Sequence, residues 1–270
     1  AQHSLRKLYD KHRGRLVDST RLTADIRLPD LTADRFVDLY PLLPYQIDMI
    51  INIVSGLRMQ GGASRHVGGA NRTIIKLAQQ LLVNPATALA GEPVGRLARI
   101  DQIYDLIEGN IGSELRGKIA SIPAEVAHPL AQPVAKAICL LQFVQSIHRT
   151  AENIAALLLP AVDADSRLPE VRAALEALEK AQKVRKTEDG YRIPSPVEDD
   201  WERQRSGITI KSGEARRLRA EVVQTLWQPQ PHHTLLDTKK FRAGLTLDGD
   251  ELAQGDITFH VALAAAGGDA

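Results

Sequence analysis

The segment YPLLPYQIDMIINIVSGLRMQGGASRHVGGANRTIIKLAQQLL (residues 40–82) decides the fold predicted for this chain. Apolar side chains recur three and four positions apart in residues 45–59 and in residues 71–82, which predicts two amphipathic helices. Four glycines and three cations lie in or beside the connection: Gly61, Gly62, Gly68, Gly69, Arg58, Arg65 and Arg72. This connection is too rich in glycine for a helix and too basic to be buried without a partner. The segment therefore predicts two helices that present a cationic loop to an anion or to another subunit.

The composition is that of an ordinary globular protein. The chain has 270 residues, of which 44% are hydrophobic and 25% are charged, enough for one large domain or two to three small ones. Lys and Arg number 34 against 33 Asp and Glu, so the formal net charge is +1. The overall charge therefore argues neither for nor against a nucleic-acid partner, and only local clustering can decide.

One cysteine, Cys139, lies in the apolar run AKAICLLQFV. A single cysteine excludes an intramolecular disulfide, and the run predicts a buried, inert thiol rather than a nucleophile. The sequence shows no apolar run of transmembrane length and no signal peptide, so we expect a cytoplasmic protein without a membrane partner. Because Ala1 already lies within a helical pattern, we expect a fragment of a larger protein.

Residues 1–125 are predicted to form a helical domain. Short helices are expected at residues 5–9 and 13–17, and a further helix at residues 30–39 ends before Pro41. Another helix is predicted at residues 95–108. A break marked by three glycines then leads to Pro123 and to a domain boundary near residue 125; these glycines are Gly109, Gly112 and Gly117.

Residues 126–200 have the rhythm of a winged-helix domain. Three helices are predicted at residues 133–146, 151–159 and 169–183, the second with Thr150 as its N-cap. Two short extended segments, residues 184–187 and 191–193, flank the turn signal Asp189-Gly190. Three helices followed by a small hairpin are typical of this domain class.

The winged-helix pattern invites a DNA-binding interpretation. The candidate nucleic-acid contacts are the cations of the third helix and of the hairpin: Arg172, Lys183, Lys186 and Arg192. The third helix, however, also carries Glu170, Glu176 and Glu179. Phosphate contacts need net positive charge toward the duplex, so a scaffold role in protein contacts remains the alternative.

Residues 201–270 are predicted to form a C-terminal helix and a β-hairpin. The carboxylates of residues 198–202 are interpreted as an acidic linker, and residues 212–227 as a helix capped by Ser212. Residues 228–233 (QPQPHH) are predicted to be a second linker. Alternating apolar residues in 241–247 and 257–263, around Asp248-Gly249, predict the two strands of the hairpin.

Motifs of self-contained catalysis are missing from the sequence. It contains no GxxxxGK[ST], no GxGxxG after a strand, no HExxH, no CxxC and no GxSxG. We therefore expect no metal site and no independent enzyme in this chain. An unfamiliar active site around Arg65, His66 and Arg72 is the least favoured alternative.

Several longer segments resemble a known family. YPLLPYQ, SGLRMQGGASRHVGGANRTIIKLAQQLL, RLARIDQIYDLI, HPLAQPVAKAICLLQFVQ and HRTAENIAALL are similar to the large P-loop ATPase of BREX phage-defence systems, the BrxC/PglY type. The resemblance covers most of the chain. It implies a likeness to AAA+ ATPases of the Orc/Cdc6-like and STAND groups, in which a helical lid and then a winged helix follow the nucleotide-binding core.

The resemblance implies a role for the glycine-rich connection. Gly69-Ala70-Asn71-Arg72 matches the Gly-x-x-Arg pattern with which an AAA+ lid helix places its sensor-2 arginine near the γ-phosphate. Arg72 would contact the phosphate bidentately, with Arg65 or Arg58 as a second phosphate contact or a finger toward a neighbouring subunit. The alternative is that Arg72 caps the helix or pairs with a carboxylate. The Walker A and B segments are missing, so the resemblance assigns ATP to a full-length parent and not to this chain alone.

Two hypotheses of function follow. In the first, the chain is the non-catalytic lid and winged-helix segment of a BREX ATPase, which couples nucleotide state to DNA or to a protein partner. Its partners would be the upstream P-loop core of the same protein, other BREX proteins, double-stranded DNA and further copies in a homo-oligomer. In the second, the chain is a stand-alone winged-helix DNA-binding or adaptor protein.

Overall fold

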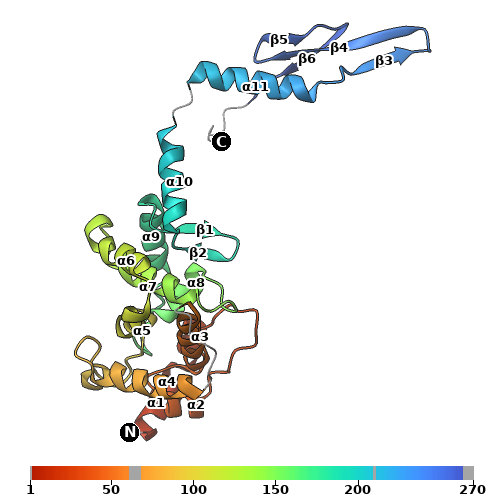
Figure 1. Cartoon of the computed structure of the whole chain (residues 1–270). Coiled ribbons are helices and arrows are strands. Elements are labelled where there is room, and N and C mark those ends of the chain that lie inside the picture. Colours follow the sequence, from red (N-terminus) through yellow and green to blue (C-terminus); the bar gives the residue numbers. More distant parts are fainter. Residues whose placement is uncertain (1, 61–67, 209–210, 264–270) are drawn as a thin grey trace. The chain divides into compact units, whose positions relative to one another are not determined.

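The computed structural model of the protein describes residues 2–60, 68–208 and 211–263. The chain divides into two compact units, Ala1–Asp199 and Asp200–Ala270 (Figure 1). The elements of the first unit are α1 (Gln2–Ser19), α2 (Ala33–Leu39), α3 (Pro44–Gln60), α4 (Gly68–Val83), the 3-10 helix η1 (Leu89–Gly91), α5 (Ile100–Ile107), the 3-10 helix η2 (Glu108–Asn110), α6 (Ser113–Glu125), α7 (Ala131–Leu141), α8 (Ala151–Leu157), α9 (Leu168–Lys180), β1 (Arg185–Thr187) and β2 (Gly190–Arg192). The prediction of a mainly α-helical fold is confirmed.

Helix α7 lies at the centre of the first unit and packs against α5, α6, α8 and α9. Eight of its eleven residues are buried: Ala131, Val134, Ala135, Ala137, Ile138, Cys139, Leu140 and Leu141. Burial raises the pKa of the Cys139 thiol to about 12, so the prediction of a buried thiol is confirmed. A helix that is apolar on nearly every side has to be enclosed by other helices.

Asn153 ties α8 to the N-terminal part of the chain. Its side chain is fully buried, accepts a hydrogen bond from the Thr23 amide (2.8 Å), and donates to the carbonyl oxygens of Thr23 (2.8 Å) and His148 (2.7 Å). The Thr150 hydroxyl accepts a hydrogen bond from the Asn153 amide, which confirms Thr150 as the N-cap of α8. Every polar atom of this buried amide group therefore has a partner.

The antiparallel hairpin β1–β2 is attached to the segment that precedes α8. Arg149 donates its amide hydrogen to Asp189 O (3.1 Å) and accepts from the Tyr191 amide (2.9 Å). Gly190 lies directly against this segment with φ +100°, and a Cβ there would stand 2.4 Å from Arg149 O. Glycine is needed at position 190 for both its backbone conformation and its size.

Two predictions for the N-terminal half are wrong. Residues 2–19 form the single helix α1, with Tyr9 and Leu16 buried, rather than two short pieces. The break expected at Gly109, Gly112 and Gly117 contains α6, which includes Gly117 and Pro123. A helical glycine costs only about 1 kcal/mol, and the burial of Ile119 and Ile122 offsets that cost.

Helices α4 and α5 begin at other positions than predicted. Gly68 and Gly69 belong to the first turn of α4 instead of the preceding connection. Helix α5 begins at Ile100 rather than near residue 95, because the Leu97 and Ala98 amides donate to the carbonyl oxygens of Pro160 and Pro41 (both 3.0 Å). These tertiary hydrogen bonds hold the preceding residues in an extended conformation.

The predicted acidic linker at residues 198–202 is instead part of α10 (Pro196–Gly207), which begins in the first unit and ends in the second. Ser195 and Glu198 form a capping box: the Ser195 hydroxyl accepts from the Glu198 amide, and the Glu198 carboxylate accepts from the Ser195 amide. Pro196 suits the first helical position, and the early carboxylates suit the helix dipole. The sequence SPVE was therefore a helix-start signal that the prediction overlooked.

The second unit contains α11 (Ser212–Leu226), β3 (His232–Leu235), β4 (Lys239–Leu247), β5 (Asp250–Ala253) and β6 (Ile257–Val261). Helix α11 was predicted, but Ser212 does not cap it: Lys211 holds the N-cap position, without a side-chain hydrogen bond. His232 and His233 belong to β3 and not to a linker.

The predicted C-terminal hairpin is wrong in its pairing. The turn at Asp248-Gly249 leads into β5, which pairs antiparallel with β4. The predicted return strand, β6, pairs with β4 in parallel, with Leu245 opposite Phe259. An alternating pattern identifies a strand, but it does not determine which neighbour the strand pairs with.

The domain boundaries of the sequence-based prediction stay predictions. The apolar core of the first unit is continuous from Tyr9 to Ile193 and passes the boundary expected near residue 125. In the ranges that the structure describes, no helix is both long enough and apolar enough to span a lipid bilayer.

We predict that Gly190→Ala lowers the free energy of unfolding of the first unit by about 1–3 kcal/mol, because the new Cβ meets backbone at a positive φ. Urea denaturation followed by circular dichroism measures this change. Gly117→Ala in α6 is the control: a Cβ there meets nothing within 4 Å, and we expect a gain of about 0.5–1 kcal/mol. Equal stability of Gly190→Ala and the wild type would contradict the prediction.

Candidate functional site

The candidate phosphate contacts lie at the start of α4. Gly69 belongs to the first turn of this helix, Arg72 is the fifth residue of the helix, and Arg65 lies outside the described residues. Arg58 lies in the last turn of α3 and is half-buried. The structure therefore places the backbone of the Gly-x-x-Arg sequence at a helix N-terminus, where unpaired amide groups and the helix dipole favour an anion.

Packing orients this helix pair. Leu77 and Leu81 of α4 are buried, and α4 contacts both α3 and α5. On α3 the buried face comprises Tyr45, Met49, Ile50, Ile53, Val54 and Leu57. Helix α4 is thus anchored through its apolar face to the core that contains α7.

Three of the four predicted nucleic-acid contacts form ion pairs within the first unit. The Arg172 guanidinium donates to Glu152 Oε1 (2.8 Å), and Lys183 Nζ lies 2.5 Å from Glu125 Oε2. Arg192 pairs with Glu198 through both of its terminal nitrogens. A side chain held by a carboxylate has less positive charge to offer a phosphate.

These pairs lower the pKa values of the acidic partners. Hydrogen bonding from Arg192 is the largest cause that lowers the pKa of Glu198 to about 2, and the Ser195 amide adds to it. The pKa of Glu125 is lowered chiefly by its hydrogen bond from Lys183, and that of Glu152 by its hydrogen bond from Arg172. In each case the hydrogen bond favours the ionised carboxylate.

Lys186 is the exception among the four predicted contacts. It lies on β1 opposite Tyr191, is exposed, and has no hydrogen bond or ion pair with any residue in the described ranges. The four cations therefore do not form one unpaired basic surface. On α9 itself, Arg172 and Lys180 are outnumbered by three glutamates.

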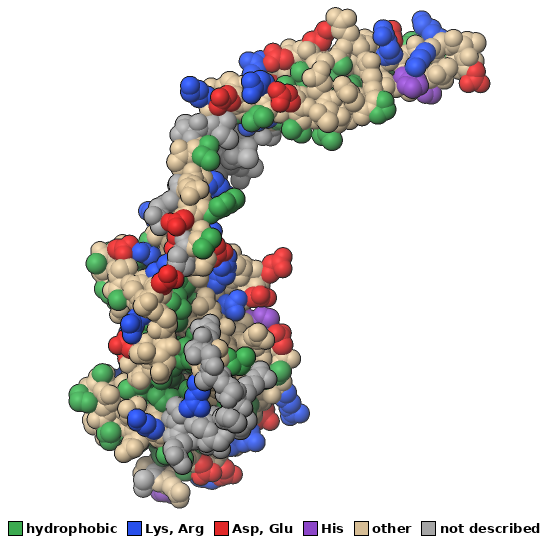
Figure 2. All heavy atoms as spheres, in the orientation of Figure 1, with side chains coloured by type: hydrophobic (Ala, Val, Ile, Leu, Met, Phe, Trp, Pro, Cys, Tyr) green, Lys and Arg blue, Asp and Glu red, His purple; other side chains and the backbone are tan. Residues whose placement is uncertain are grey.

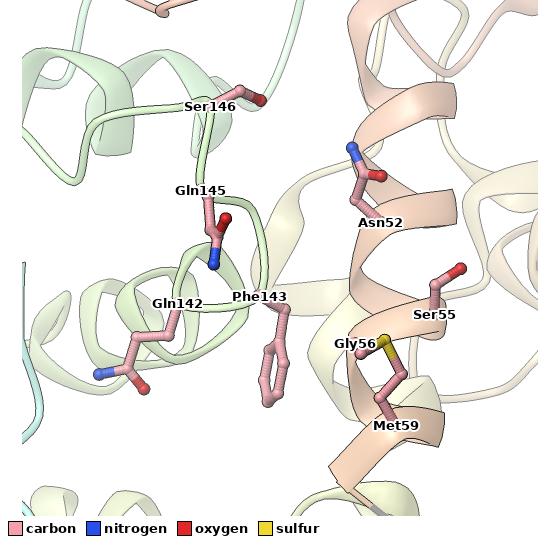
Figure 3. Close-up of a pocket in the computed structure, with 8 residues that line it drawn as sticks. All are labelled: Asn52, Ser55, Gly56, Met59, Gln142, Phe143, Gln145 and Ser146. Atoms are coloured by element: carbon pink, nitrogen blue, oxygen red, sulfur yellow. The ribbon is translucent and has the colours of Figure 1, made fainter. Parts of the chain in front are cut away.

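A cleft of about 640 Å³ lies between α3 and the residues that follow α7. Figure 3 shows α3 as one wall and residues 142–146 as the other. The lining residues are Asn52, Ser55, Gly56, Met59, Gln142, Phe143, Gln145 and Ser146. A Cβ at position 56 would lie 3.0 Å from the Phe143 ring, so Gly56 allows the close approach of the two walls. The carboxamide and hydroxyl side chains that line the cleft suit a neutral ligand group that both donates and accepts hydrogen bonds.

The sequence-based prediction missed this cleft, because its residues come from two segments about 90 positions apart and form no motif. Among the described residues there is no group of three His, Cys, Asp or Glu side chains that could hold a metal ion. No protein-family model matches the chain, and no solved structure matches it.

We predict that the Arg192–Glu198 pair makes stability depend on acid pH. The folded-state pKa of Glu198 is depressed from its ordinary value of 4.5 to about 2, so its contribution is present above about pH 4.5 and is lost as the pH falls toward 2. Glu198→Gln should therefore show a smaller loss of unfolding free energy over this range than the wild type, as measured by denaturation at a series of pH values.

Glu188→Gln is the matched control, because Glu188 is an exposed carboxylate of the β1–β2 turn without a side-chain hydrogen bond or ion pair to a described residue. Its pH dependence should match that of the wild type. Identical acid sensitivity of Glu198→Gln and the wild type would show that the pair does not stabilise the fold.

Proposed function

We propose that this chain is the lid and winged-helix segment of a cytoplasmic P-loop ATPase similar to the BrxC/PglY type of BREX phage-defence systems. In this proposal the segment does not hydrolyse ATP by itself. It transmits the nucleotide state of the parent protein to a partner. The likeness is carried by the sequence segments around residues 40–82 and 95–159.

The observation that supports this function best is the continuous core of the first unit. Helix α4 contacts α5, α5 contacts α7, and α7 in turn contacts α9 and β2. Because protein interiors are densely packed, the displacement of one helix shifts the elements that pack against it. A shift of α4 on contact with a phosphate would therefore displace α9 and the β1–β2 hairpin.

The roles proposed for individual residues follow from their positions. Arg72 would act as the sensor of the γ-phosphate, with Arg65 as a second phosphate contact and with Gly69 in the same helical turn. Helices α7, α8 and α9 with the β1–β2 hairpin would form the winged helix, and its partner would be DNA or another defence protein. Copies of the parent would associate through their ATPase cores.

A stand-alone adaptor is the second candidate function. The ion pairs of Arg172, Lys183 and Arg192 favour a protein partner over DNA for the proposed winged helix. A surface whose cations are paired with carboxylates is compatible with protein contacts, but it is unfavourable opposite the phosphate backbone of DNA.

We predict that Arg72→Ala in the ATPase that contains this chain lowers ATP turnover by at least about tenfold and leaves ATP affinity mostly unchanged, since a phosphate-sensing arginine acts chiefly in the transition state. Steady-state hydrolysis and nucleotide titration measure the two quantities. Lys76→Ala is the control, because Lys76 is exposed one turn further along α4. Unchanged turnover in Arg72→Ala would make Arg72 structural and would favour the adaptor.

A further inference from the structure

The strands β3 and β4 of the second unit form a two-stranded ribbon. Residues 239–242 of β4 pair only with β3, because β5 and β6 pair with the later residues of β4. Figure 1 shows β3 and the start of β4 extending past β5 and β6. All four residues of β3 are exposed, as are Lys239, Lys240 and Arg242. A two-stranded ribbon that is solvent-exposed on both faces gains little stability of its own, and its surface is accessible to a binding partner.

The register sorts the side chains of the ribbon onto two faces. His232 stands opposite Arg242 and Thr234 opposite Lys240, so these four residues share one face, which we call the donor face. Each of the four can donate a hydrogen bond, and two are permanent cations. The other face carries His233, Leu235 and Lys239 with Phe241, and the Lys239 ammonium lies 5.0 Å from the Phe241 ring centre.

The side chains of the donor face are not engaged within the described part of the chain. None of the four forms a side-chain hydrogen bond or ion pair with a described residue, in contrast to Arg172, Lys183 and Arg192. The turn between β3 and β4 contains Asp237, and the Asp256 carboxylate accepts a hydrogen bond from the Arg242 amide (2.8 Å). Figure 2 shows Lys, Arg and His side chains over this end of the unit, together with acidic side chains.

The rest of the sheet limits where a partner can contact it. On the opposite face, Trp227 of the α11 end packs edge-on against Phe259 (5.6 Å between ring centres) and donates to Ala243 O (3.1 Å). On the side of the donor face, the sheet continues beyond the ribbon with Thr246. The Thr246 hydroxyl is hydrogen-bonded to His260 (2.7 Å), and Thr246 stands opposite Glu251. The unengaged cations of the donor face, Lys240 and Arg242, therefore lie on the ribbon, and the carboxylates of Asp256 and Glu251 lie in the neighbouring part of the sheet.

We propose that the donor face of the β3–β4 ribbon binds double-stranded DNA in the major groove. That groove, about 12 Å wide, admits a two-stranded ribbon, and Lys, Arg and Thr are side chains that contact base edges there. The A-form groove of double-stranded RNA is too narrow for this contact. The ribbon would be a DNA contact distinct from α9 and the β1–β2 hairpin, and it does not depend on the ATPase proposal.

The test uses the full 270-residue chain and a fluorescently labelled DNA duplex, with anisotropy measured from about 50 to about 200 mM salt. We expect Lys240→Gln with Arg242→Gln to weaken binding at least about tenfold, and to reduce the slope of log K against log salt by about 1 for each of the two cations that contacts a phosphate. Methyl green, a major-groove ligand, should compete with the protein, and netropsin should not.

Two double variants serve as controls. Arg217→Gln with Arg219→Gln makes the same charge change on exposed positions of α11 and should leave affinity within about twofold. Lys186→Ala with Arg192→Ala removes two of the DNA contacts predicted for the winged helix, and it should weaken duplex binding less than the ribbon variant does. Circular dichroism should show native helix content for the ribbon and α11 variants, since their substituted side chains are exposed.

Four results would overturn the inference. They are the absence of duplex binding at about 50 mM salt, equal losses in the ribbon and α11 variants, loss only in the Lys186/Arg192 variant, or competition by netropsin alone. Binding to poly-glutamate or to phosphatidylserine vesicles without binding to DNA would also overturn it, and would assign the ribbon to an acidic protein or to a membrane surface. Failure of this test leaves the ATP turnover of Arg72→Ala unaffected, so the two proposals can be judged separately.

Discussion

Burial of α7 is the constraint on which the first unit depends. Eight of its eleven residues are buried, and fully burying a large side chain such as Ile138, Leu140 or Leu141 stabilises the fold by about 1.5–3 kcal/mol. A helix of this kind cannot face water on any broad side. Helices α5, α6, α8 and α9 enclose it, and this enclosure connects the pair α3–α4 to the β1–β2 hairpin within one core.

Most cations predicted to contact nucleic acid in the first unit differ from the cations of the β3–β4 ribbon in having carboxylate partners. In the first unit, Arg172, Lys183 and Arg192 are held by carboxylates, and Lys118 pairs with Asp199 at the start of α10. These pairs tie α6, α8, α9 and β2 to neighbouring elements, a structural role. In the second unit, Lys240 and Arg242 stand on a ribbon without such partners. Charge that is neutralised within the fold supports the fold, and charge that is left exposed is available to a ligand.

Sequence patterns predicted most helices of the first unit, because their apolar residues recur at helical spacing. They failed where a local signal was weak compared with tertiary packing. Helix α6 contains Gly117 and Pro123, both read as breaks, yet the burial of Ile119 and Ile122 keeps it helical. The run of carboxylates in α10 favoured a linker, whereas the Ser195–Glu198 capping box starts a helix there. The start of α5 is set by hydrogen bonds to Pro41 and Pro160, which no local pattern contains.

The sequence by itself determined the helical character, the cap at Thr150 and the turn at Asp189-Gly190, because each depends on neighbours within a few residues. The apolar run around Cys139 indicated a buried thiol, and the helices packed around α7 bury it. Only the tertiary structure decided the pairing of β6 with β4, the ion pair between Arg172 and Glu152, and the unengaged face of the β3–β4 ribbon. These features join residues that are distant along the chain. Their free energy depends on which surfaces meet, and a one-dimensional pattern of apolar and charged residues leaves that choice open.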